Sequence, residues 1–211
     1  MGDTINQKSE VNMGFDVYGL NPTIKEGSVR PKEIDYEVAT EEERKAYWEA
    51  KEKFQDENVG EYFRNNVWWW RQLAHYVYEY TGEISEADYD EWHMNSGHQV
   101  DEDRAIRIAN SLDALIKKGH TAEKEKEVNE AMKVASVHNA KVEKKMEALK
   151  QEVIKLTGKD NLAPADYPEV QKKKWDKLYK QRSWEDSYPF DVENVQRFAN
   201  FCRQSGGFEI C

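Results

Sequence analysis

Apolar and polar positions alternate in one short segment near each end of the chain. Residues 13–19 alternate before a turn at Asn21-Pro22, and residues 208–211 alternate after a pair of glycines. A period of two is typical of a strand with one buried face. Because each segment is too short to be stable alone, we expect the two to pair in a small sheet.

Polar capping residues mark the starts of several helices between these segments. Thr40 with Glu43 forms a capping-box pattern, which predicts a helix to about residue 54. Asp101 and Asp191 each precede a helix with an apolar stripe that is expected to face the core. The two stripes are Ile108, Leu112, Leu115 and Ile116, and Val195, Phe198, Ala199 and Cys202. We interpret residues 83–100 as a loop with at most one helical turn.

The segment 61–71 has the sequence EYFRNNVWWWR and is the most informative feature of the chain. We interpret it as the first part of a helix that starts at about Tyr62 or at about Asn66 and ends near Tyr80. If the helix starts near Arg64, one face carries four polar and aromatic residues: Arg64, Trp68, Arg71 and His75. A second face is apolar and is expected to enter the core: Val67, Trp70, Ala74 and Val77.

Residues 121–156 carry a heptad seam in which the inward positions are alternately three and four residues apart. The seam comprises Val128, Met132, Ala135, Asn139, Val142, Met146, Leu149, Val153 and Leu156. It needs an apolar partner. That partner is either the predicted helix 168–182 of the same chain or, in a homodimer, the seam helix 121–156 of a second chain. A buried asparagine such as Asn139 often fixes register or oligomeric state.

Together these patterns predict a mainly α protein. We expect a compact helical domain with a small two-stranded sheet from the N- and C-terminal segments, and a protruding hairpin of long helices. Residues 1–12 are interpreted as a disordered extension. Residues 13–120 and 183–211 form the aromatic-rich core domain, and residues 121–182 form a charged, coiled-coil-like helical hairpin inserted into it.

Charge is distributed unevenly along the 211 residues, whose net charge is −10. Acidic residues outnumber basic ones by 20 to 6 in 33–103, whereas basic residues lead by 12 to 7 in 141–182. General nucleic-acid binding is therefore disfavoured. No apolar run approaches the roughly 20 residues that span a bilayer, and no secretory signal opens the chain. With only two cysteines, Cys202 and Cys211, we expect a cytoplasmic protein without disulfides.

Two arginines that flank a tryptophan form the best candidate for a binding site. Guanidinium groups match phosphate or carboxylate oxygens, and an indole offers a flat surface to a planar group such as a nucleotide base. Asp16 lies between apolar neighbours in the N-terminal strand and needs a partner such as Arg64 or Arg71. The candidate ligand-binding residues are Arg64, Asn65, Asn66, Trp68, Arg71, His75, Asp16 and Tyr18. The alternative is a structural ladder in which arginine stacks on tryptophan and pairs with nearby carboxylates.

Catalytic chemistry finds little support in the sequence. Nucleophile elbows, phosphate-binding loops and zinc-protease motifs are missing, so we predict no catalytic residues, no metal and no cofactor. His93 and His98 lie among acidic residues, but their spacing of five matches no familiar metal motif. Cys202 is expected in the core.

Three segments together resemble an uncharacterised family of small bacteriophage-encoded proteins. They are 13–22 (MGFDVYGLNP), 60–71 (GEYFRNNVWWWR) and 188–211 (YPFDVENV followed by SGGFEIC). Members often begin at the equivalent of Met13. Gln72 stands where the family has proline, and the Cys-x-x-Cys pairs that some relatives carry in the middle are absent here, so zinc is not carried over.

The resemblance implies a phage protein of the host cytoplasm with a role in host takeover or defence evasion. Our first hypothesis is a non-enzymatic binding protein that inhibits a host immune protein or sequesters an anionic nucleotide. An enzyme acting on a nucleotide or phosphoester is a second hypothesis. A structural or assembly protein whose coiled-coil seam is the function is a third.

Overall fold

The computed structural model describes residues 14–211, so the extension predicted for residues 1–12 and the start of the first strand at Met13 lie outside the described residues. The described elements, in chain order, are β1 (Gly14–Gly19), α1 (Glu41–Glu57), β2 (Tyr62–Asn66), α2 (Val67–Thr81), α3 (Glu86–Glu91), β3 (His98–Val100), α4 (Glu102–Lys117), α5 (His120–Thr157), α6 (Glu169–Tyr179), α7 (Val192–Gln204) and β4 (Phe208–Ile210). Two short 3₁₀ turns lie at Pro164–Asp166 and Glu185–Ser187. The described chain is therefore mainly helical, as the sequence predicts.

The strands form one antiparallel sheet with the order β2-β1-β4-β3. The predicted pairing of the terminal segments is confirmed, because Val17 lies opposite Ile210 in the β1–β4 register. The prediction of only two strands is wrong. β2 comes from residues interpreted as the start of a helix, and β3 comes from the predicted loop 83–100. Both add hydrogen bonds to a central pair that is too short to be stable alone.

Capping residues start the helices where the sequence places them. Thr40 and Glu43 form the complete capping box of α1, with Glu43 N donating to Thr40 Oγ1 at 3.2 Å. Asp101 accepts from Arg104 N at 2.8 Å, and Asp191 accepts from Asn194 N at 2.6 Å. These side chains satisfy amide groups that have no partner within the helix.

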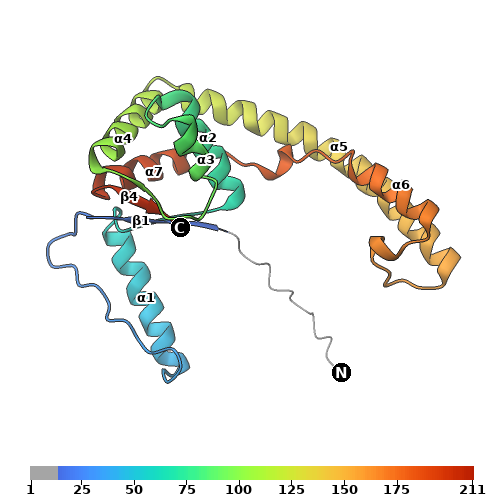
Figure 1. Ribbon diagram of the computed structural model, residues 1–211, viewed down its shortest axis with the longest axis horizontal. Coiled ribbons are helices and arrows are strands. Elements are labelled where there is room, and N and C mark those ends of the chain that lie inside the picture. Colours follow the sequence, from blue (N-terminus) through green and yellow to red (C-terminus); the bar gives the residue numbers. More distant parts are fainter. Residues whose placement is uncertain (1–13) are drawn as a thin grey trace. The chain divides into compact units, whose positions relative to one another are not determined.

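The core lies against one face of the sheet, where α2 and α7 pack on β1 and β2 (Figure 1). Trp70 is fully buried, and its ring stacks on Phe15 of β1 at 5.4 Å and on Trp92 at 5.7 Å. The predicted inward faces of α4 and α7 pack against each other. Cys202 is buried among them, and burial raises the pKa of its thiol, so the expected core position is confirmed.

The described chain forms two compact units. One comprises the described residues up to Glu125 together with Phe190–Cys211, and the other comprises Lys126–Pro189. The long helix α5 contributes its first turns to one unit and the rest to the other.

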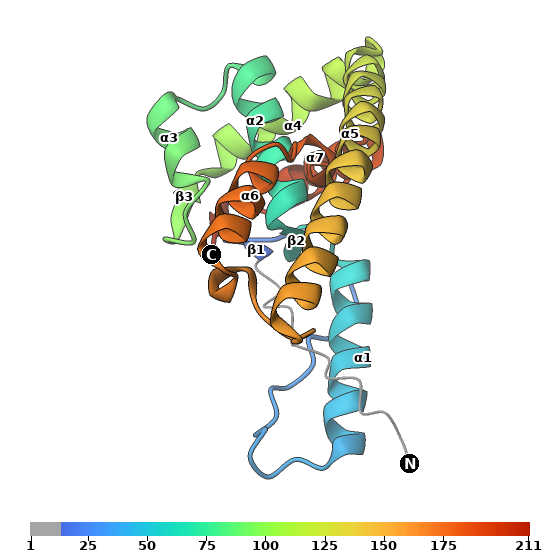
Figure 2. The ribbon, with the colours of Figure 1, turned by 90° about the vertical axis from the view of Figure 1, so that its right-hand side faces the viewer.

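Within the second unit, α6 runs beside the C-terminal half of α5 (Figure 2). Lys174 Nζ lies 3.0 Å from Glu152 Oε1, and Gln171 Nε2 donates to the same oxygen at 3.0 Å. The middle of the seam is buried in this single chain, at Val142, Met146, Leu149 and Val153, whereas Leu156 is exposed. Among residues 14–211, no helix combines the length and apolar character needed to cross a membrane.

Candidate functional site

The sheet has a second face, which points away from α2 and α7 and carries polar and aromatic side chains. Phe15, Val17 and Phe63 are buried on the core side, and the residues that alternate with them point outward. The outward residues of β1 and β2 are Asp16, Tyr18, Tyr62 and Arg64. We call these four residues the outer-face cluster.

Asp16 is the centre of the outer-face cluster. Its Oδ1 accepts a hydrogen bond from the Tyr62 hydroxyl and lies 3.4 Å from Nε of Arg64, which is directly opposite in the β1–β2 register. Burial and the hydrogen bond to Asp16 raise the pKa of Tyr62, so its hydroxyl stays a donor at neutral pH. Arg64 thus supplies the partner that a carboxylate at this position requires.

Tyr18 connects the outer-face cluster with neighbouring strands. Its ring lies 5.3 Å from the ring of Tyr62, and it is 46% exposed. In the sheet it stands opposite Glu209 of β4, which accepts a hydrogen bond from Gln99 of β3 at 2.7 Å. A continuous polar and aromatic row therefore crosses the sheet on this side.

The predicted helical face of Arg64, Trp68, Arg71 and His75 does not exist as one surface. The helix begins only at Val67, because the Asn66 side chain accepts from the amides of Trp68 and Trp69 at 3.0 and 3.1 Å. Arg64 therefore lies in a strand and pairs across the sheet, and a helical start before Asn66 is wrong. Asn66 acts as the cap of α2, so its amide oxygen is engaged.

The remaining members of that predicted face lie on the surface of α2. Trp68 is 36% exposed, and Arg71 is exposed near the hydroxyl of Tyr89. His75 contacts Glu79 through Nε2 at 3.1 Å and the Tyr89 hydroxyl through Nδ1 at 3.3 Å. Trp68 and His75 therefore have partners within the protein.

Asn65 points to the opposite face of the sheet from Arg64. It pairs with Phe15 across β1–β2 and is only 7% exposed. Its amide nitrogen is buried without a hydrogen-bond partner. The structure thus separates the eight predicted residues into the outer face, the surface of α2 and the core side of β2.

A cavity of about 220 Å³ adjoins Tyr18 and lies between the sheet, α1 and the segment 30–33. Its lining combines aromatic, cationic and acidic side chains: Tyr18, Tyr47, Phe54, Arg30, Lys51, Gln55, Glu33, Glu61 and Pro31. Arg30 Nη2 donates to Glu61 at 2.7 Å, and the Arg30 guanidinium carbon lies 5.3 Å from the centre of the Phe54 ring. The Arg30 guanidinium, one of the two cationic groups that line the cavity, is therefore already paired with a carboxylate.

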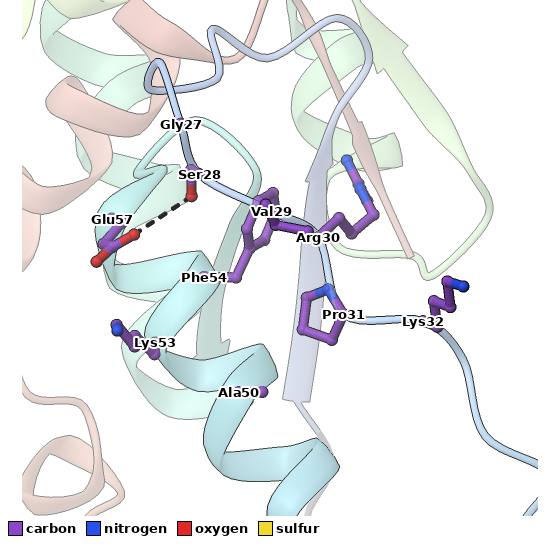
Figure 3. A pocket seen from close by; sticks show the side chains of 10 residues that line it. All are labelled: Gly27, Ser28, Val29, Arg30, Pro31, Lys32, Ala50, Lys53, Phe54 and Glu57. Atoms are coloured by element: carbon purple, nitrogen blue, oxygen red, sulfur yellow. Dashed lines mark hydrogen bonds between the residues drawn. The ribbon is translucent and has the colours of Figure 1, made fainter.

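A second cavity of about 470 Å³ is lined by residues 27–32 and by α1 (Figure 3). Figure 3 shows the segment 27–32 passing along α1, with the Phe54 side chain directed from the helix toward Val29. Ser28 donates to Glu57 at 3.3 Å. Two contacts therefore fix the segment on α1: this hydrogen bond and the Arg30–Phe54 contact.

An exposed aromatic cluster on and beside α1 was missed by the sequence analysis. Tyr36, Tyr47 and Trp48 lie within 5.6–6.2 Å of one another, and Lys51 Nζ lies 5.0 Å from the Trp48 ring. Trp48 is 53% exposed and Tyr36 is 43% exposed. The adjacent Tyr47-Trp48 pair in an otherwise charged helix was the available signal.

The two histidines beside α3, His93 and His98, contact other residues of the protein. His98 Nε2 lies 3.5 Å from Asp88 Oδ1, and Arg104 Nη1 lies 3.1 Å from Asp88 Oδ2. His93 contacts the backbone oxygen of Tyr89 at 2.8 Å. Across residues 14–211, no three histidine, cysteine or acidic side chains are grouped as a metal site would require.

Comparison with known proteins finds no relative of this chain. No family model matches the chain, and the searches of the curated proteins and of the solved structures give no match.

Proposed function

We propose that this protein is a non-enzymatic binding protein that acts on a host protein, in the phage setting that its sequence motifs imply. The proposal rests on the exposure of helix α1 to solvent. This helix has 17 residues and buries only Phe54, while Trp48 and its aromatic neighbours are exposed. Helices of this length depend on packing against a partner for most of their stability. An intermolecular partner that packs on α1 would supply it.

The exposed aromatic side chains are of the type that protein interfaces use. Tyrosine, tryptophan and arginine are enriched among the residues that contribute most to binding. Tyr47 belongs both to the aromatic cluster and to the cavity beside Tyr18. The proposed interface therefore extends from Trp48 through this cavity to the outer-face cluster with Asp16 and Arg64.

Charge indicates the kind of surface that α1 would meet. Acidic residues outnumber basic ones by seven to four in α1, and Glu33, Asp35 and Glu37 precede it. We therefore propose a basic face on the partner protein. An anionic nucleotide is less well supported here, because Arg30 is paired with Glu61 and two glutamates line the cavity.

The second unit is not part of the proposed interface, because a lysine-rich surface does not complement a basic face on the partner. We interpret α5 and α6 as a charged helical hairpin, whose surface from residue 141 to 182 is rich in lysine. The buried seam of α5 is used within the chain, which leaves less apolar surface for a homodimer. Binding in the host cytoplasm, and inhibition of a host defence protein, remain parts of the proposal.

Affinity purification from bacterial lysate tests the proposal with a matched pair of variants. Trp48→Ala removes the exposed indole of α1, and Trp184→Ala removes an indole of similar exposure, 47%, in the second unit. We expect a captured protein whose Kd, measured with purified components, rises by roughly 30-fold for Trp48→Ala, as for a hot-spot residue. Trp184→Ala should change it by less than about threefold.

The proposal fails if every protein captured by the wild type is captured equally well by unrelated acidic bait proteins. It also fails if Trp48→Ala and Trp184→Ala bind the captured protein equally well. Circular dichroism of both variants establishes that the fold is retained. A captured protein that the wild type chemically alters would instead support the enzyme hypothesis.

A further inference from the structure

A cavity of about 250 Å³ lies on the core side of β2, away from the outer-face cluster and the α1 surface. Six residues from β2, α2 and the start of α7 line it: Asn65, Trp69, Asp191, Glu193, Asn194 and Arg197. The cavity is smaller than a typical site for a drug-sized ligand, and it suits a single small ring system.

Asn65 gives this cavity an unfulfilled hydrogen-bonding group. The residue is only 7% exposed, and its Nδ2 has no hydrogen-bond partner in the structure. A buried amide without a partner costs about 1–3 kcal/mol. The amide exchanges its oxygen and nitrogen positions by a half turn about its last bond, so it can present either a donor or an acceptor to the cavity.

The other lining residues restrict what can complement Asn65. Asp191 accepts from Asn194 N at 2.6 Å, and Glu125 accepts from Val192 N at 3.0 Å, so two of the first three amides of α7 are occupied. A phosphate would also meet the carboxylates of Asp191 and Glu193. Those carboxylates accept hydrogen bonds, which favours a ligand with N–H groups.

Trp69 and Arg197 add flat surfaces to the same cavity. An indole stacks on planar rings, and a guanidinium does the same. The Arg197 guanidinium carbon already lies 5.6 Å from the centre of the Phe63 ring, which keeps this side chain against the core. The cavity thus combines a planar environment with two side-chain amides and two carboxylates.

We propose that this cavity binds a nucleobase whose edge carries a carbonyl next to N–H groups, as in guanine or uracil. The Asn65 amide donates to the carbonyl, and the carboxylate of Glu193 accepts from an N–H group, since the carboxylate of Asp191 already caps α7. Adenine lacks a carbonyl and fits this set of partners less well. The proposal is independent of the protein-binding function, because the α1 surface takes no part in it.

Saturation-transfer NMR and calorimetry with guanosine, uridine and adenosine test the site in the full-length protein. Wild type should bind guanosine or uridine at least tenfold more tightly than adenosine. Asn65→Ala and Glu193→Gln should each weaken that binding by at least tenfold. The control Asn129→Ala, an exposed asparagine of α5, should leave it unchanged.

Thermal unfolding separates a loss of the site from a loss of the fold. Because Asn65→Ala removes an unpaired buried amide, its Tm should be equal to or above that of wild type. If Asn65→Ala unfolds, Glu193→Gln decides the question, because Glu193 is exposed. The proposal is overturned if no nucleoside binds at millimolar concentration, which would leave water as the occupant, or if binding survives in Glu193→Gln and in folded Asn65→Ala.

Discussion

At the residue scale, two asparagines are buried to a similar degree but have opposite hydrogen-bonding states. Asn139 is 2% exposed, and its Nδ2 donates to Ser183 O at 2.8 Å and to Asp186 Oδ2 at 2.7 Å. Its Oδ1 accepts from Ser183 N at 2.9 Å. Asn65 has no partner for its Nδ2. Asn139 therefore holds the segment after α6 on α5, whereas Asn65 is available to a ligand.

Replacing Asn139 with leucine should destabilise the second unit. The change removes three hydrogen bonds and leaves the partly buried amide of Ser183 without an acceptor, so we expect a loss of about 2–4 kcal/mol. Hydrogen exchange should show earlier opening of residues 183–187. Light scattering should show an unchanged oligomeric state, and a change in that state would instead support a seam between two chains.

At the element scale, the six-residue helix α3 depends on the charge of Asp88. Burial alone would raise the pKa of this carboxyl, but the Ser85 amide and hydroxyl donate to it at 2.9 and 2.8 Å, and Arg104 and His98 lie nearby. These contacts outweigh burial and lower the pKa of Asp88 below its ordinary value of 3.8. The ionised carboxylate of Asp88 therefore stabilises the folded state.

Asp88→Asn should lower the free energy of unfolding by about 1–2 kcal/mol at pH 7. Because the folded pKa is depressed, the contribution of Asp88 is present above pH 3.8 and is lost as the pH falls through the folded pKa. Urea unfolding at pH 7 and pH 3 should show the difference between wild type and variant shrinking at the lower pH. A constant difference, or an equal effect of Asp90→Asn, would contradict this account.

The connection between α1 and β2 depends on the absence of a side chain at Gly60. A Cβ built at this position would lie 2.1 Å from the backbone oxygen of Gln204, near the end of α7. Gly60→Ala should therefore destabilise the core by about 2–3 kcal/mol, since backbone must move. Gly27→Ala is the control, because its Cβ meets no atom within 4 Å and only its positive φ of 81° opposes the change. Equal losses in chemical denaturation would exclude the steric explanation.

At the scale of the whole molecule, the first unit contains the sheet and its packed helices without residues 126–189. Glu125 and Val192 are close, because the Val192 amide donates to the Glu125 carboxylate at 3.0 Å. Replacing Lys126–Pro189 by about six glycine and serine residues should span the remaining distance. We expect one cooperative unfolding transition with the near-ultraviolet signal of a packed core, and a non-cooperative transition would show that the first unit needs the second.

Much of the fold was predictable because the deciding interactions are local. Thr40, Asp101 and Asp191 cap helices through side chains within three residues, and helical spacing identified Trp70 as a core residue. Alternation marked the terminal strands, since a strand with one buried face requires it. Their pairing was predictable because neither could be stable alone.

Tertiary structure decided the position of the candidate site. Residues 62–66 carry no local signal that separates a strand from a first helical turn, and only pairing with β1 makes them a strand. That pairing turned Arg64 toward Asp16 and Asn65 toward the core, so the residues of one predicted site lie on three different surfaces. Capping and spacing are determined within a few residues, whereas strand pairing depends on residues far apart in the chain, such as Asp16 and Arg64.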